Sequence, residues 1–206
     1  MTHKTKVAFQ GIRGAYSELS LRNYFDDGVE PVSCESFDAV FTAVAEKAVD
    51  FGYVPVENSI AGTVVENYDL LLASNTVVIG EAYMPIRHML LGIEGATLAQ
   101  VREVHSHPQA LSQCAVFLKK HNIRPMATYD TAGSAKLIAE WQDPNKAAIA
   151  SELCADYYPV NILEREIQTN STNTTRFFVI VRSDQKPGSV RAEKTTVAFK
   201  TRHYPG

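Results

Sequence analysis

The sequence lacks the features of a membrane or nucleic-acid-binding protein. No apolar run in its 206 residues approaches the roughly 20 residues that a membrane-spanning helix needs. The formal net charge is only −3, and the Lys and Arg residues are scattered rather than gathered into a basic stripe, which disfavours a nucleic-acid module. Residues 1–6 lead into a strand pattern without the apolar region of a signal peptide. We therefore expect a cytoplasmic protein whose partner is a small molecule.

Cysteine and metal-binding motifs are scarce as well. The three cysteines (Cys34, Cys114 and Cys154) are odd in number, widely spaced and in apolar surroundings. This pattern indicates reduced thiols rather than a disulfide framework. The six histidines include no HxxxH or HExxH pair, so we expect no metal site.

A short apolar strand, a polar turn and an amphipathic helix recur along the chain. This alternation predicts an α/β fold with mainly parallel sheets and flanking helices. The length suits two lobes that the chain crosses more than once, with candidate hinges at residues 84–92 and 168–174. We expect lobe one to comprise residues 1–82 and 170–182, and lobe two residues 83–169. One helix is expected over residues 109–121.

Polar turns precede several of the predicted helices, at residues 11–17, 57–63, 106–113 and 130–134. In a parallel sheet such turns share one edge, where helix N-termini offer N–H groups and partial positive charge. Two facing lobes would set them on the walls of a cleft for a small anionic ligand. Each turn also has a purely structural interpretation, because Asn58 and Ser59 can cap a helix and Gln113 can be a surface residue. Residue patterns alone predict an anion-binding cleft, in an enzyme or in a binding protein.

Thr175 and Arg176 stand before five consecutive apolar residues, 177–181, which predict a buried strand. Sheets of α/β proteins place ligands at such strand ends. Taken alone, both residues are ordinary for a strand. Successive strand residues point to opposite faces, so whether Arg176 faces a ligand or is structural stays open.

Several stretches, in this order, resemble the prephenate dehydratases of phenylalanine biosynthesis over roughly residues 5–182. They are GxxGxYS at residues 11–17, PVENSxxGTV at 55–64, SHPQALxQC at 106–114, DTAGSA at 130–135 and TRF at 175–177. The resemblance implies a two-lobed catalytic domain, similar to type II periplasmic binding proteins, with its site between the lobes. It implies loss of water and carbon dioxide from prephenate to give phenylpyruvate, without a metal or cofactor because aromatisation drives the reaction.

The resemblance also implies roles for individual residues. Thr175 is expected nearest the departing hydroxyl, as the catalytic residue. Substrate-binding roles fall to Asn58, Ser59, Ser106, Gln113, Thr131, Arg176 and Phe177. A threonine hydroxyl titrates far above neutral pH, so we expect Thr175 to act as a positioned hydrogen-bond donor. Whether it also relays a proton from water is left open.

Two other interpretations share these patterns. One is an arogenate dehydratase, with an amine in place of the substrate's ketone. The other is a non-catalytic two-lobed protein that binds a small molecule. We further expect residues 183–193 to be a linker and residues 194–206 to be the truncated start of an ACT domain, which in the family binds phenylalanine as feedback inhibitor. A homodimer or homotetramer is the assembly that the resemblance implies, and because we expect an incomplete ACT domain we also expect insensitivity to phenylalanine.

Overall fold

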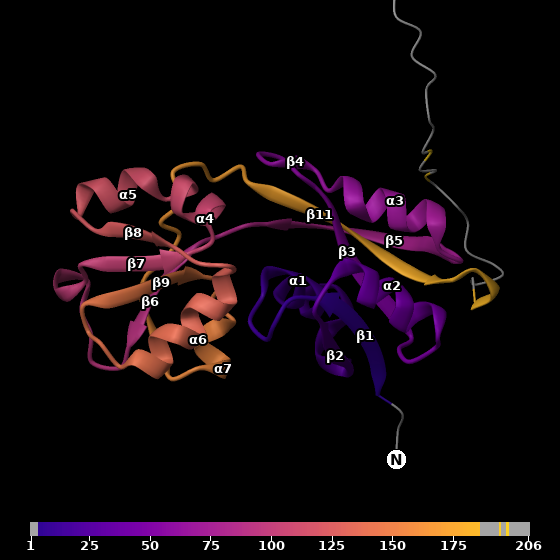
Figure 1. Cartoon of the computed structure of the whole chain (residues 1–206), viewed down its shortest axis with the longest axis horizontal. Coiled ribbons are helices and arrows are strands. Elements are labelled where there is room, and N and C mark those ends of the chain that lie inside the picture. Colours follow the sequence, from indigo (N-terminus) through magenta and orange to yellow (C-terminus); the bar gives the residue numbers. More distant parts are fainter. Residues whose placement is uncertain (1–3, 186–193, 195–196, 198–206) are drawn as a thin grey trace, which may run out of the picture.

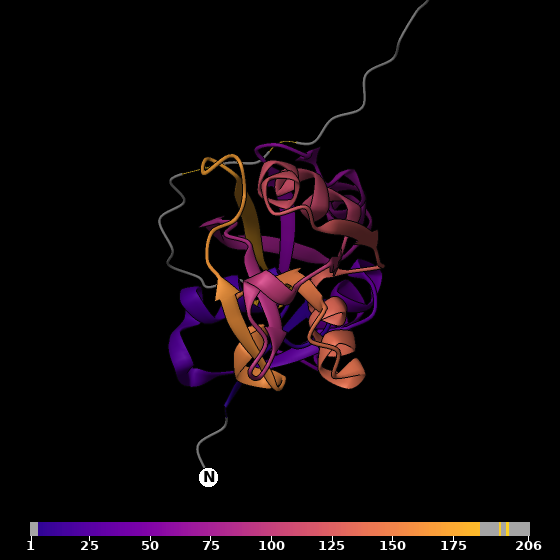
Figure 2. The same cartoon turned by 90° about the vertical axis from the view of Figure 1, so that its left-hand side faces the viewer.

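The computed structural model describes residues 4–185 together with Lys194 and Val197. The described chain forms two α/β lobes that lie end to end, each built on one sheet (Figure 1). Viewed along the long axis, the second lobe stands in front of the first (Figure 2). No helix among the described residues has the length and apolar character to cross a membrane.

The first lobe holds a sheet with the order β2-β1-β3-β11-β5, and β4 pairs with β3. Its strands are β1 (Thr5–Gln10), β2 (Val29–Cys34), β3 (Phe51–Asn58), β4 (Gly62–Thr63), β5 (Thr76–Pro85) and β11 (Thr174–Arg182). Its helices are α1 (Tyr16–Phe25), α2 (Phe37–Ala45) and α3 (Val65–Ala73), with 3-10 turns η1 (Asp26–Gly28) and η3 (Ser183–Gln185).

The second lobe holds a five-stranded sheet with the order β10-β6-β9-β7-β8. Its strands are β6 (Met89–Ile93), β7 (Glu103–Ser106), β8 (Arg124–Ala127), β9 (Lys146–Ala150) and β10 (Val160–Glu164). Its helices are α4 (Pro108–Gln113), α5 (Ala115–Lys120), α6 (Thr131–Trp141) and α7 (Cys154–Tyr157), with a 3-10 turn η2 (Leu98–Gln100).

The predicted two-lobed α/β fold is confirmed, but both sheets are mixed rather than mainly parallel. Parallel pairing is confined to β2-β1-β3 and to β8-β7-β9. Strand β11 runs antiparallel to β3 and β5, and β6 runs antiparallel to β9 and β10. The reason is topological, because the chain enters and leaves the second lobe through strands instead of helices. Strand β5 stays in the first sheet to Pro85, past the predicted lobe boundary at residue 82.

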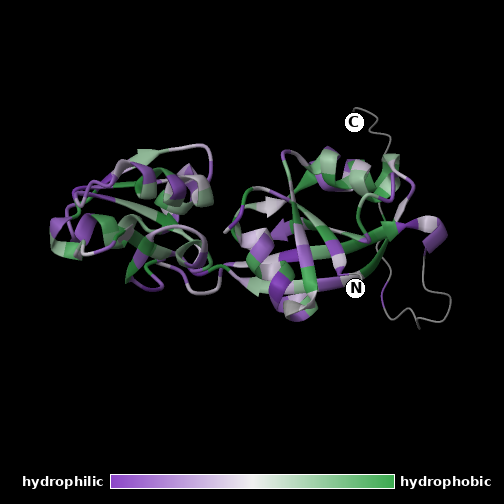
Figure 3. Ribbon diagram, turned by 90° about the horizontal axis from the view of Figure 1, so that it is seen from below, coloured by the Kyte–Doolittle hydropathy of each residue, from purple (hydrophilic) through white to green (hydrophobic). Residues whose placement is uncertain are grey.

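The apolar run of β11 is buried on both faces of the first sheet. Phe177 and Val179 pack into the core on one face, whereas Phe178 and Ile180 pack into the core on the other. A strand covered on both sides needs no polar alternation, which accounts for the unbroken apolar sequence. Each face of the second sheet likewise has its own core, and apolar residues follow the inner strands of both lobes (Figure 3).

The predicted helix over residues 109–121 is divided at Cys114 into α4 and α5. The carbonyl oxygen of Gln113 accepts a hydrogen bond from the backbone N–H of Thr169, at 2.8 Å, on the segment that returns to the first lobe. The return crossing therefore ties down the last residue of α4 from outside the helix. The expected linker and ACT-like strand lie outside the described residues except for η3, Lys194 and Val197.

Within the described residues, the lobes meet at two places. The crossing segments, residues 86–88 and 165–173, run side by side, and Ile86 N–H donates to the Asn173 carbonyl at 2.8 Å. On the other side, the Gly14 carbonyl accepts from the Ser151 hydroxyl at 2.6 Å, and the Tyr157 hydroxyl donates to buried Glu18 at 2.6 Å. Gly14 has a φ of +88°, and a Cβ there would lie 2.6 Å from a cysteine sulfur, so this second contact needs glycine.

Candidate active site

A cavity of about 350 Å³ lies between the lobes, a size typical of small-molecule sites. All of the polar turns picked out in the sequence contribute to its wall, and so do both crossing segments. The polar lining residues are Tyr16, Ser17, Asn58, Thr63, His88, His107, Gln109, Gln113, Asp130, Thr131, Asn173 and Thr175. Residues that are distant in the chain therefore face one shared cavity.

Asn58, at the end of β3, fixes the hydrogen bonding of Thr175 on the neighbouring β11. The Oδ1 atom of Asn58 accepts from the backbone N–H groups of Ile60 and Ala61, at 3.0 and 2.9 Å. Only an oxygen can accept both, so Nδ2 points the other way and donates to Thr175 Oγ1 at 2.9 Å. The Thr175 hydroxyl is thus an acceptor in this contact. Within the described chain it donates to no protein group, which leaves its proton for a ligand.

Gln113, the last residue of α4, presents its amide to the same cavity. Its Oε1 accepts from Asn173 Nδ2 at 3.0 Å and lies 2.6 Å from His88 Nε2. Asn173 in turn accepts from Asn58 Nδ2 at 2.7 Å. Among the residues that the structure describes, the Gln113 Nε2 group has no protein partner, so its two hydrogens can also donate to a ligand.

Sequence reasoning missed Tyr16, His88 and Asn173 as site residues. The Tyr16 hydroxyl lies 2.6 Å from His88 Nδ1, and His88 Nε2 contacts Gln113. Burial lowers the pKa of His88 and raises the pKa of Tyr16 well above its ordinary value. Tyr16 belongs to the GxxGxYS stretch and Asn173 is close to TRF. Tyr16 and Asn173 could have been found in the sequence from their position in or beside those stretches. For His88 the only signal was its place on a crossing segment.

Thr131 and Phe177 line the cavity as expected from the resemblance. Thr131 begins α6, and its neighbour Asp130 caps that helix through Gly133 N–H at 2.5 Å. Phe177 is buried and stacks on Tyr53, with ring centroids 5.0 Å apart. Asp130 is the single charged side chain of the lining apart from the titratable histidines. Helix α6 directs its N-terminus, with its partial positive charge, to this wall.

Ser59 and Ser106 do not line the cavity, so the expectation of a binding role for their side chains is corrected. Ser106 is fully buried, and its hydroxyl donates to the Ile149 carbonyl of β9 at 2.6 Å. Ser59 donates to the Thr172 carbonyl at 3.1 Å and accepts from Thr174 N–H at 2.9 Å. Both hydroxyls are therefore engaged in holding backbone segments together.

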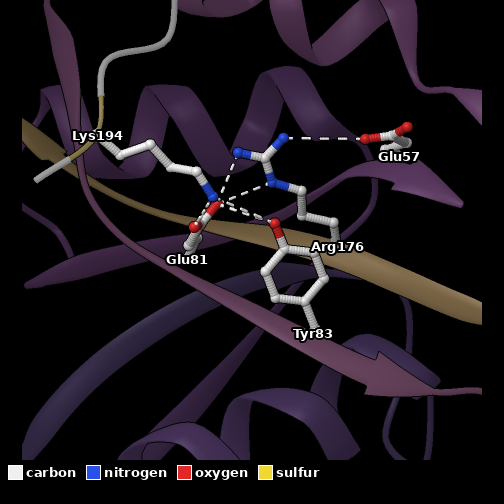
Figure 4. A network of polar contacts seen from close by, with 5 residues as sticks. All are labelled: Glu57, Glu81, Tyr83, Arg176 and Lys194. Carbon is white, nitrogen blue, oxygen red and sulfur yellow. Dashed lines mark hydrogen bonds and ion pairs between the residues drawn. The ribbon is translucent and has the colours of Figure 1, made fainter.

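Arg176 is not among the residues that line the cavity, and its side chain extends toward Glu81 and Glu57 (Figure 4). Its Nε and Nη2 atoms donate to Glu81 Oε2 at 2.9 and 2.6 Å, and its guanidinium stacks 4.8 Å from the Phe178 ring centre. Lys194 bonds to the same carboxylate, and the hydrogen bonds from Lys194 and Arg176 lower the pKa of Glu81. The open question is answered in favour of the structural role, as strand alternation requires.

No three His, Cys, Asp or Glu side chains gather closely enough to hold a metal ion in the described part of the chain. The cavity instead offers hydroxyl and amide donors from both lobes, and residues at the N-termini of α1, α4 and α6 line it. Such a wall can bind an anion and stabilise negative charge that develops on an oxygen atom.

Comparison with known proteins places this geometry in a family. A family model described as prephenate dehydratase matches residues 7–185. The arogenate dehydratase/prephenate dehydratase 2 of Arabidopsis thaliana, a chloroplastic protein, is 42% identical over 203 residues, which are 98% of this chain and 53% of that protein. A bifunctional N-acyl-homoserine lactone acylase/prephenate dehydratase of Komagataeibacter europaeus is 34% identical over 97% of this chain and 71% of that protein.

Structural similarity agrees with the sequence relatives. The crystal structure of prephenate dehydratase from Arthrobacter aurescens in complex with L-Phe superposes with a TM-score of 0.81 at 26% identity. That match covers 92% of this chain and 63% of the other. Nearly all of this chain is matched by the plant relative, but the chain spans only about half of that relative's length.

Proposed function

Because the chain belongs to the prephenate dehydratase family, we propose that it removes water and carbon dioxide from prephenate to form phenylpyruvate. The observation that carries this proposal is the Thr175 hydroxyl, which accepts from Asn58 and keeps its proton for the cavity. Arogenate, with an amine in place of the ketone, is the second candidate substrate, favoured by the name of the 42% identical plant relative.

The chemistry needs a donor at the departing oxygen. As the ring carboxylate leaves as carbon dioxide, its bonding electrons enter the ring and the ring hydroxyl departs as hydroxide, which takes up a proton to become water. Negative charge therefore grows on the departing oxygen. A hydroxyl already positioned by Asn58 can donate to this oxygen without reorganising, the kind of electrostatic help that is worth about 10²–10³ in kcat.

Neutral donors would hold the carboxylates of the substrate. The Gln113 amide hydrogens have no protein partner in the described chain, and Thr131 stands at the start of α6. Together they offer hydrogen bonds and the helix dipole to an anion. Asp130 is engaged in capping α6, which compensates part of its negative charge.

The purified chain should form phenylpyruvate from prephenate, and phenylalanine from arogenate if the second candidate is right. Thr175→Val keeps the shape of the side chain and removes the hydroxyl, so its kcat should fall by about 10²–10³. Thr175→Ser retains a hydroxyl and should recover most of the rate. Binding of either compound without turnover would favour the non-catalytic alternative, and turnover of neither would refute the proposal.

N-Acyl-homoserine lactone serves as a third compound in the same assay, since the Komagataeibacter europaeus relative is named for that activity too. We expect no acyl transfer to Thr175. A nucleophilic hydroxyl needs a neighbouring base, whereas the described neighbour of Thr175 Oγ1 is the amide donor of Asn58. The cytoplasmic location and the homodimer or homotetramer stay predictions, to be measured by cell fractionation and by light scattering.

A further inference from the structure

We propose that Tyr16 and His88 are positioning residues for Gln113, because they fix the direction of its side-chain amide and so decide which of its atoms face the substrate. The proposal rests on the proposed function, in which Gln113 binds the substrate. It concerns residues from different parts of the molecule: Tyr16 begins α1 in the first lobe, His88 lies on the first crossing and Gln113 ends α4 in the second lobe.

The orientation of the Gln113 amide toward Asn173 is determined by backbone N–H groups, which act through Asn58. The N–H groups of Ile60 and Ala61 orient Asn58, whose Nδ2 then donates to Asn173 Oδ1 at 2.7 Å. Since Asn173 uses its oxygen there, its nitrogen faces Gln113 and must donate, at 3.0 Å, to Oε1. On this side Gln113 has to present its oxygen.

The other side is fixed by the tautomer of His88. Its Nε2 lies 2.6 Å from the same Gln113 Oε1, so Nε2 has to carry a hydrogen for the contact to be a bond. Burial lowers the pKa of His88 and favours the neutral ring, which has one N–H only. Nδ1 is then an acceptor. The Tyr16 hydroxyl also lies 3.1 Å from the Arg87 carbonyl, but its one hydrogen goes to Nδ1, which is the nearer acceptor at 2.6 Å.

The two sides meet at one atom. Oε1 of Gln113 receives hydrogen bonds from Asn173 and from His88, and both hydrogens of Nε2 are left for the cavity. Turning the amide over would place an NH2 group against two donors, a contact with no acceptor in it. Tyr16 therefore acts at a distance, since it makes His88 a donor and thereby keeps the Gln113 nitrogen toward the substrate.

The arrangement also depends on the approach of the lobes. Tyr16 and His88 are 72 residues apart in the chain, and their contact joins α1 to the crossing segment. The backbone of His88 is held separately, because its N–H donates to Gln168 Oε1 at 2.8 Å and its carbonyl accepts from Ile167 N–H at 2.9 Å. Removal of the Tyr16 hydroxyl also takes away its 3.1 Å contact with the Arg87 carbonyl. Both His88 backbone bonds remain, so the main change should be in the hydrogen-bonding state of the ring.

The first test is a double-mutant cycle on prephenate turnover. Tyr16→Phe and Gln113→Leu should each raise KM by about 10- to 100-fold, the effect of losing a hydrogen bond to a charged group. Together they should cost little more than Gln113→Leu alone, because Tyr16 acts through Gln113. His88→Gln places an amide nitrogen near the former Nε2 and should retain more activity than His88→Leu. His121→Leu, at the end of α5, is the control for loss of a histidine outside the cavity.

The second test does not depend on turnover. Nitrogen NMR of 15N-histidine-labelled protein, with the His88 signal assigned from His88→Gln, should show a ring protonated at Nε2 alone in the wild type. In Tyr16→Phe the Nδ1-protonated form should appear as well. A wild-type ring protonated at Nδ1, or additive effects of Tyr16→Phe and Gln113→Leu, would overturn the positioning role. A chain that turns over neither substrate would refute the proposed function, and the NMR result would still decide this inference.

Discussion

Replacing Asn58 by aspartate reverses one hydrogen bond and leaves the shape of the side chain almost unchanged. One carboxylate oxygen would still accept from the N–H groups of Ile60 and Ala61. The other would replace the nitrogen that now lies 2.9 Å from Thr175 Oγ1. The Thr175 hydroxyl would then donate to this oxygen and lose the proton that we assign to the departing hydroxyl.

The expected loss in kcat follows from the reversal of the hydrogen bond between residue 58 and Thr175. Loss of one preorganised donor to a developing oxyanion costs about 2.7–4 kcal/mol in the activation free energy, or about 10²–10³ in kcat. Asn58→Asp should therefore resemble Thr175→Val in kcat. The new carboxylate would also face Asn173 Oδ1, now at 2.7 Å, and leaving that acceptor unsatisfied should lower the free energy of unfolding by about 1–3 kcal/mol.

The assay compares kcat and KM of both variants with the wild type, on prephenate and on arogenate, together with urea unfolding. Asn161→Asp is a matched control, since Asn161 is exposed on β10 and the substitution adds the same charge away from the cavity. Wild-type kcat in Asn58→Asp, with a folded protein, would show that the Thr175 proton is not needed and would refute the reasoning.

Three further predictions concern parts of the molecule that surround the cavity. Arg176→Leu should lower the free energy of unfolding by about 1–3 kcal/mol, between the values for exposed and buried ion pairs, because it removes both Arg176 hydrogen bonds to Glu81 and leaves that carboxylate with Lys194. The kcat of this variant should stay near the wild-type value, and a large loss of kcat would contradict the structural role. Burial lowers the pKa of His88, so below about pH 6.5 the unfolded chain binds a proton at this residue more readily than the folded chain does. The contribution of neutral His88 to stability is therefore fully present above about pH 6.5 and is lost as the pH falls below that value. Urea unfolding at successive pH values should show a shallower loss of stability in His88→Gln than in the wild type. Tyr157→Phe removes the hydrogen bond to buried Glu18 that joins the lobes. This variant should lose about 1–3 kcal/mol of stability, and its radius of gyration in X-ray scattering should increase. An unchanged radius would show that this contact does not hold the lobes together.

The elements of the fold could be found from the sequence because their signals are local. Strand and helix periodicity located most elements, and local side-chain bonds start the helices, as Ser36 and Asp130 do by accepting from Ala39 and Gly133 N–H. The antiparallel pairing of β11 with β3 and β5 could not be found this way. It joins residues that are distant in the chain, from Thr174 and Pro85, 89 positions apart, to Ile180 and Gly52, 128 positions apart. No periodicity encodes the direction of such a partner.

The site was only partly predictable for a related reason. Asn58, Gln113 and Thr175 belong to stretches with a family resemblance, so their presence in one cavity was expected. His88 is defined as a site residue by side-chain contacts to Tyr16 and Gln113, which arise when the lobes come together. Ser106 was misplaced because the direction of a side chain at a strand end depends on its partner, here the Ile149 carbonyl.

The near absence of charge in the lining has a consequence for how the protein responds to salt. A cleft that holds an anion with lysine or arginine loses affinity as ions screen the attraction, over a distance of about 8 Å at physiological ionic strength. Here the lining residues offer amides, hydroxyls and a helix end, with no Lys or Arg among them. Hydrogen bonds made at contact are displaced by ions far less readily. Turnover should therefore depend less on salt than in a cleft lined by lysine or arginine, and the remaining dependence should come from the helix end, whose partial charge salt also screens.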